Sequence, residues 1–249
     1  MDTPPTLRNV ERLAGAGGLI FVATLVVQNA LRANAPGLDA SPTAVMPYFA
    51  HPGAAALVPL GLFPIGMLGL FAFVAAIWAL ADTDECRWWA SLGVLGTASI
   101  AALFAVVNIT EIVLVSKAEQ LADAPAVVAA LWTLHAAAFG LDLAAIAIAL
   151  IGLSRTSAAM RLVPHWIATV ALLGAVCLLT PAVFSLALTS NAAWMAPALV
   201  GFAVWIVFVA MASISLVRRR PIQRGSVHGA ERDGRYASAR PARKLQQSA

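Results

Sequence analysis

The amino-acid sequence predicts an all-α fold, a polytopic membrane helix bundle with six transmembrane helices. Of its residues 61% are hydrophobic and 11% are charged, whereas soluble domains average about 45–50% apolar and about 25% charged residues. Long apolar runs alternate with short polar segments. A chain of 249 residues has room for about six spans of about 20 residues and for no second folded domain. The lipid bilayer is therefore the expected main partner.

The apolar runs define three regions. Residues 1–12 form a short polar segment, and residues 218–249 form a basic tail whose low hydrophobicity predicts disorder. Between them lies the transmembrane domain, 13–217, with spans expected at about 13–31, 54–80, 89–115, 126–153, 163–188 and 193–217. We expect the first span to be retained, because Pro36 directly follows the only sequence there that resembles a signal-peptide cleavage site.

The longest internal loop follows the first span. Its sequence DASPTAVMPYFAHP begins a helix at Ser41, with Pro42 at the first helical position, and predicts a short amphipathic helix on the membrane surface with Tyr48 as an interfacial anchor. The second span contains Pro59 and Pro64, which predict a kink. Its glycines, Gly61, Gly66 and Gly69, allow close helix approach.

The positive-inside rule orients the bundle. Two segments next to the spans contain few Lys or Arg residues, only Arg32 and Lys117, while the alternate segments and the tail contain all the others. This asymmetry predicts that both termini are cytoplasmic. The tail begins with Arg218, Arg219 and Arg220, which are expected either to contact anionic lipid headgroups or to set the topology. The same position next to a span argues against nucleic acid as a partner.

Four polar residues inside the third and fourth spans form the candidate site. Asn108 and Glu111 share one helical face, and His135 and Asp142 share another. At about 1.5 Å per residue, Asn108, Glu111 and His135 fall at similar depths in the outer half of the membrane, while Asp142 lies about 10 Å further in and needs another partner or a water molecule.

Three hypotheses follow for this cluster. The main one is structural, with hydrogen bonds that join the third and fourth spans while the protein acts as an interaction or signalling partner. The second is a small-solute or proton pathway through Glu111, His135 and Asp142. The third is an intramembrane enzyme, although no metal-ligand motif is present and we expect no metal and no cofactor. The sequence defines no catalytic residue, protein partner, substrate or oligomeric state.

Two stretches resemble a known group of proteins. RLAGAGGLI at Arg12 to Ile20 and the outer segment at Asp39 to Pro52 are similar to stretches in uncharacterised six-span membrane proteins that are frequent in actinobacteria and classed as domains of unknown function. The resemblance implies the six-helix fold and a location in the bacterial cell membrane. It implies no activity and transfers no catalytic residue.

Overall fold

The computed structural model describes residues 5–184 and 191–218. Its helices, in order, are α1 (Pro5–Leu31), η1 (Arg32–Asn34), α2 (Pro42–Ala50), α3 (Ala54–Leu80), α4 (Asp84–Ser116), α5 (Ala118–Leu121), α6 (Pro125–Ala159), α7 (His165–Val183), η2 (Ala192–Met195) and α9 (Ala196–Arg218). No strand occurs in the described residues. Six of the helices are long and apolar enough to cross a membrane, which confirms the all-α six-span fold and makes this a multi-pass membrane protein.

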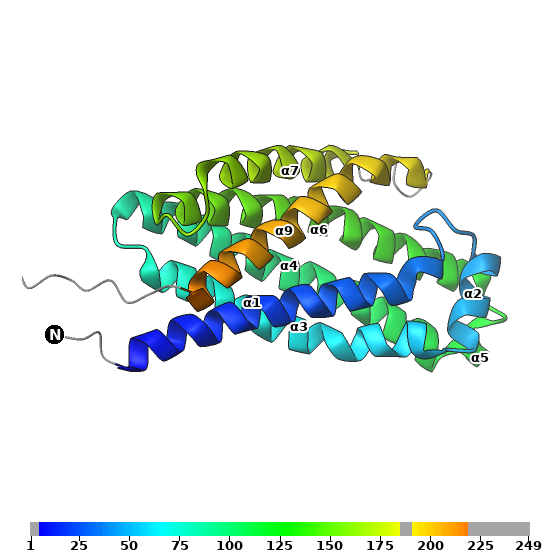
Figure 1. Ribbon diagram of the computed structural model, residues 1–249. Coiled ribbons are helices and arrows are strands. Elements are labelled where there is room, and N and C mark those ends of the chain that lie inside the picture. Colours follow the sequence, from blue (N-terminus) through cyan, green and yellow to red (C-terminus); the bar gives the residue numbers. More distant parts are fainter. Residues whose placement is uncertain (1–4, 185–190, 219–249) are drawn as a thin grey trace, which may run out of the picture.

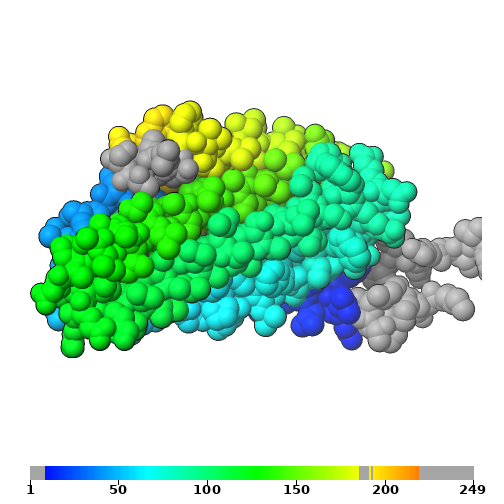
Figure 2. All heavy atoms as spheres, turned by 180° about the vertical axis from the view of Figure 1, so that it is seen from behind, coloured from blue at the N-terminus to red at the C-terminus, as the bar shows by residue number. Residues whose placement is uncertain are grey.

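The six long helices form a ring. Each packs on the next in the order α1, α3, α4, α6, α7 and α9, and α9 returns to α1. Figure 1 shows the start of α1 and the end of α9 at one end of the bundle, which we name the terminal end, and α2 and α5 at the other, which we name the α2 end. On the face seen in Figure 2, α4 lies between α3 and α6. Of the six, α6 is the most buried.

Several helices extend beyond the spans expected from the apolar runs. Helix α1 begins at Pro5, within the segment expected to precede the first span, and α6 continues to Ala159. Helix α4 begins at Asp84, where the Thr83 side chain accepts a hydrogen bond from the Cys86 amide. A helix ends where its capping residues place it, not where its apolar residues stop, so polar turns can continue a membrane helix past the lipid.

The predicted amphipathic helix is present as α2, but its apolar face does not lie on lipid. Val45 and Phe49 are buried in a cluster with residues of α4, α5 and α6, including Trp132. The apolar stripe of α2 meets the ends of α4 and α6. Helix α2 lies across the ends of these two helices at the α2 end of the bundle (Figure 1).

Glycines allow the helices to approach closely in the terminal half of the bundle. A Cβ atom on Gly152 of α6 would meet the backbone of Gly93 and Trp89 on α4. Gly17 of α1 and Gly69 of α3 face each other in the same way. Such contacts bring backbones together and favour van der Waals packing between membrane helices.

Some predicted features lie outside the described residues. These are the tail beyond Arg218, with Arg219 and Arg220, and residues 185–190, which include the expected end of the fifth span. Arg218 itself is exposed at the end of α9.

Candidate intramembrane binding cavity

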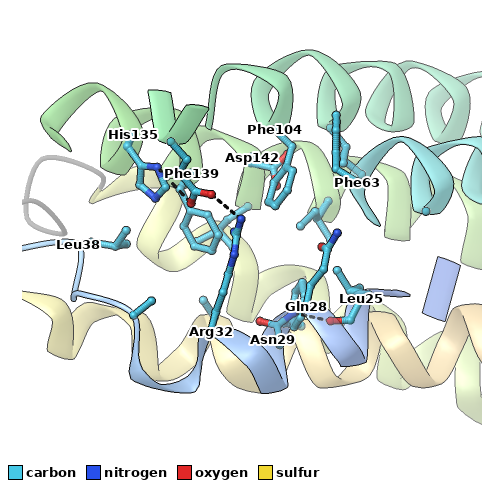
Figure 3. Close-up of a pocket in the computed structure, with 18 of the residues that line it drawn as sticks. Leu25, Gln28, Asn29, Arg32, Leu38, Phe63, Phe104, His135, Phe139 and Asp142 are labelled. Atoms are coloured by element: carbon cyan, nitrogen blue, oxygen red, sulfur yellow. Dashed lines mark hydrogen bonds and ion pairs between the residues drawn. The ribbon is translucent and has the colours of Figure 1, made fainter. Parts of the chain in front are cut away.

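A cavity of about 220 Å³ lies inside the ring in the half nearer the α2 end. Side chains from α1, α3, α4, α6 and α9 line it, and α2 and the segment before it cover it. Figure 3 shows α1 and α9 on one side of this space, and α4 and α6 on the other. Two exposed side chains, Asn29 of α1 and Leu199 of α9, mark its mouth. The cavity thus reaches the surface where α1 and α9 diverge toward the α2 end (Figure 1).

An ion pair crosses the cavity near its mouth. The Arg32 guanidinium, in η1 directly after α1, donates a hydrogen bond of 2.5 Å to Oε2 of Glu111 on α4. The Glu111 side chain is 8% exposed and that of Arg32 20%. Helix α1 does not pack extensively on α4, so this charge-assisted bond joins two parts of the ring that α3 separates.

His135 lies on the other side of Glu111. Its Nδ1 is 3.8 Å from Oε1 of Glu111 and 3.4 Å from the hydroxyl oxygen of Thr110. The Thr110 hydroxyl donates to the Val107 carbonyl, which leaves its oxygen able to accept a hydrogen bond from Nδ1. The imidazole also stacks on the indole ring of Trp132, with centroids 4.4 Å apart.

Asn108 does not join this network. Its amide nitrogen donates to the Phe104 carbonyl on its own helix, at 2.8 Å. Its Oδ1 is buried and has no hydrogen-bond partner among the described residues. The sequence groups Asn108 with Glu111 and His135, but its side chain bonds along α4 and not to either of them.

Asp142 lies deeper, on α6, and is only 2% exposed. It lines the cavity, where Figure 3 shows it on the same wall as Phe104 and Phe139. Its Oδ1 has no partner in the part of the chain that the structure describes, and no hydrogen bond or ion pair joins Asp142 to another described residue. A carboxylate buried in this way is costly unless a proton, a cation or hydrogen-bond donors accompany it.

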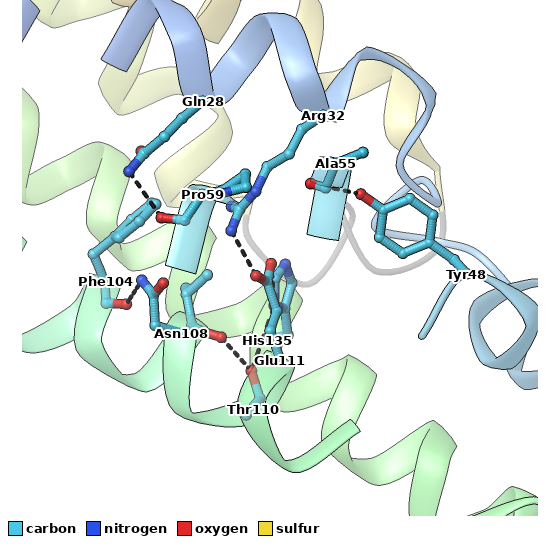
Figure 4. A network of polar contacts seen from close by, with 11 residues as sticks. Gln28, Arg32, Tyr48, Ala55, Pro59, Phe104, Asn108, Thr110, Glu111 and His135 are labelled. Atoms are coloured by element: carbon cyan, nitrogen blue, oxygen red, sulfur yellow. Dashed lines mark hydrogen bonds and ion pairs between the residues drawn. The ribbon is translucent and has the colours of Figure 1, made fainter. Parts of the chain in front are cut away.

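Two further hydrogen bonds tie the rim of the cavity to α3, as Figure 4 shows. Gln28 of α1 donates to the Pro59 carbonyl at 3.1 Å, and the Tyr48 hydroxyl of α2 donates to the Ala55 carbonyl at 3.2 Å. The second bond replaces a missing one, because the N–H that Pro59 lacks would otherwise pair with Ala55. Burial raises the pKa of Tyr48, with Arg32 opposing the shift, so its hydroxyl remains a donor at neutral pH.

Sequence reasoning missed Arg32, Gln28 and Tyr48 as residues of this cavity. The sequence assigns Arg32 only to a segment on the outer side of the membrane. The sequence does contain a signal for two of them. Gln28 and Arg32 are four residues apart, so they share one helical face at the end of an apolar run, and this pattern indicates a polar face directed into the bundle.

The class of protein is thus a multi-pass membrane protein with a ring of six helices around a polar and aromatic cavity. No protein-family model, no curated protein and no solved structure matches this chain.

Proposed function

We propose that this protein is a small-solute transporter of the bacterial cell membrane and that the cavity is its solute site. One observation carries the proposal. Glu111, His135 and Asp142, the buried acidic and imidazole side chains of the described residues, all line a single cavity. Ionisable groups in hydrocarbon are costly and characteristically face solute or ion pathways.

A purely structural role explains only part of this arrangement. Hydrogen bonds and ion pairs account for Arg32, Glu111 and His135, which join α1, α4 and α6. They do not account for Asp142, which joins nothing in the described chain. A side chain kept for structural cohesion should have a partner in the protein, whereas a side chain kept for a ligand finds its partner in that ligand.

The cavity occupies the half of the bundle nearer the α2 end and does not extend through the terminal half, which favours a carrier over a channel. Beyond its floor, toward the terminal end, glycine contacts close the space between α4 and α6 and between α1 and α3. A transporter that alternates between two faces holds its solute near the middle of the bilayer with one side closed. The cavity ends near the middle of the long helices, at residues such as Gly66 and Ile146.

The positive-inside rule supports an outward orientation for the mouth. The basic segments adjoin the terminal end, where Arg12, Arg87, Arg155 and Arg218 lie, and the α2 end has Arg32 and Lys117. With both termini in the cytoplasm, the cavity faces outward. Under this proposal the basic tail sets the topology and contacts anionic lipid headgroups. The resemblance to actinobacterial six-span proteins is consistent with this location.

Access of water to the cavity from outside tests the proposal. In a variant with Cys86 and Cys177 replaced by Ala, a thiol would be introduced either at Leu25, which lines the cavity, or at its neighbour Val26, which is 49% exposed on the outer face of α1. Membrane-impermeant methanethiosulfonate reagents react with a thiol in water and not in lipid. We expect Leu25→Cys to react in intact cells, and Val26→Cys to stay unmodified.

Labelling from the opposite side provides the control. Inverted membrane vesicles expose the cytoplasmic face, and Leu25→Cys should react there at least about tenfold more slowly if the cavity opens outward. Equal reaction of Leu25→Cys and Val26→Cys, or no reaction of Leu25→Cys from either side, would contradict a solute site and leave the cluster as structural.

A further inference from the structure

We propose that the solute is a small organic cation, an amine or quaternary ammonium, bound between the Asp142 carboxylate and the aromatic side chains of the cavity. This inference rests on the proposed function and names its substrate class. Four features of the cavity support it, namely its charge balance, its aromatic lining, its lack of metal ligands and its size.

The charge balance leaves one group without a counter-charge. Arg32 and Glu111 pair with each other, so their charges cancel within the cavity. His135 is held by Thr110 and Glu111 through Nδ1. Asp142 remains: it lines the cavity, and its buried Oδ1 has no hydrogen-bond partner among the described residues. A cationic solute in the cavity would supply the missing counter-charge.

The aromatic lining suits a cation with an apolar surface. Aromatic residues line much of the cavity, including Phe21, Phe63, Phe104, Phe139, Phe202 and Trp205. Among them Phe63 and Phe104 lie with ring centroids 5.3 Å apart, and Phe21 meets Trp205 edge-on. Aromatic faces attract organic ammonium groups, by about 2 kcal/mol or more where water is excluded.

A metal ion fits the site less well. No group of three or more His, Cys, Asp or Glu side chains that could hold a metal occurs in the described ranges. Hard cations need six or more oxygen ligands, and Asp142 is a single carboxylate among phenyl rings. The volume of about 220 Å³ is below the roughly 300–1,000 Å³ of sites for drug-sized ligands. A small ammonium compound therefore matches the cavity in size as well as in charge.

Two thiol reagents of similar size and opposite charge test this inference on the full chain. The Leu25→Cys variant would be modified with a trimethylammonium-ethyl and with a sulfonato-ethyl methanethiosulfonate, and the ratio of the two rates compared with that at Ala122→Cys, an exposed loop position. A cationic reagent that enters the cavity can take the place of a proton on Asp142, whereas an anionic reagent gains no such interaction, so we expect the cavity ratio to exceed the loop ratio by about tenfold or more.

Second-site variants identify the groups responsible. Asp142→Asn should bring the cavity ratio close to the loop ratio, whereas Asp123→Asn, the same change at an exposed position, should leave it unchanged. Phe104→Leu should weaken protection of the thiol by tetramethylammonium, and Phe71→Leu, on the outer face of α3, should not. The neutral isostere 3,3-dimethylbutan-1-ol should protect less than choline in every variant that keeps Asp142.

The outcomes separate the two proposals. If both reagents modify Leu25→Cys with the ratio found at the loop, the cavity takes solutes without preferring cations, so the cation inference fails and the transporter proposal stands. If neither reagent reaches Leu25→Cys while Ala122→Cys reacts, the transporter proposal fails as well. An increased cation ratio that persists in Asp142→Asn would also overturn the role of this carboxylate.

Discussion

The terminal half of the bundle and the half nearer the α2 end differ in how their helices meet. In the terminal half, glycines such as Gly93 and Gly152 let the backbones of α4 and α6 touch. In the half nearer the α2 end, the same helices present aromatic and polar side chains and enclose a cavity of about 220 Å³. The size of the side chains along each helix therefore determines where the helices pack closely and where they leave a cavity.

The two halves also differ in the interactions that join their helices. Backbone contact in the terminal half depends on dispersion and shape, and it tolerates almost no added volume. The cavity half is joined by individual bonds, from Arg32 to Glu111, from Gln28 to the Pro59 carbonyl and from Tyr48 to the Ala55 carbonyl. Bonds of this kind can break singly, so we expect the cavity half to be the part that moves.

The largest expected loss of stability comes from adding a side chain between the closely packed helices of the terminal half. Gly152→Leu would place a side chain against the backbone of Gly93 and Trp89, which cannot move without separating α4 from α6. Overpacking typically costs 1–3 kcal/mol, and with no flexible neighbour we expect a loss at or above about 3 kcal/mol. The measure is the yield of monodisperse protein and its unfolding in SDS. Gly61→Leu is the control, because a Cβ there meets nothing within 4 Å, and similar losses at both sites would contradict the distinction.

A smaller loss of stability is expected from removing the ion pair in the half that contains the cavity. Arg32→Gln removes one partner of a charge-assisted bond and leaves Glu111 with His135 alone, which should cost about 2 kcal/mol. The double variant Arg32→Gln with Glu111→Gln should cost less than the sum of the single changes, since no buried charge is left unpaired. SDS unfolding of the purified variants gives these values, with exposed Arg87→Gln as control. Additive losses would mean that the two residues do not interact.

The difference between the halves also explains how far the sequence could predict the structure. The six spans follow from long apolar runs, since lipid requires a continuous helix at each, and α3 has the predicted bounds. Gly66 and Gly69 approach α1 closely, as predicted, whereas a Cβ at Gly61 would meet nothing within 4 Å. The sequence could not distinguish these glycines, because periodicity gives the place of a glycine in its helix but not which helix lies opposite.

The candidate site was only partly predictable for the same reason. Glu111 and His135 are on neighbouring antiparallel helices, so equal depth was enough to bring them within 3.8 Å. Arg32 lies 79 positions before Glu111 in the chain. Its contact with Glu111 depends on how distant helices pack in the ring, and no local sequence pattern predicts that packing. The packing of α2 on the ends of α4 and α6 depends on the same arrangement of distant helices.

The smallest loss of stability is expected from removing a single hydrogen bond at the rim of the cavity. Tyr48→Phe removes the hydroxyl that satisfies the Ala55 carbonyl, and we expect a loss of about 1 kcal/mol. In a Pro59→Ala background the new backbone N–H can pair with Ala55 within α3, so there the same Tyr48→Phe change should cost close to nothing. SDS unfolding of the four proteins of this cycle measures the coupling. An equal cost of Tyr48→Phe in both backgrounds would show that its hydroxyl stabilises α2 in another way and that the proline does not create the need for this bond.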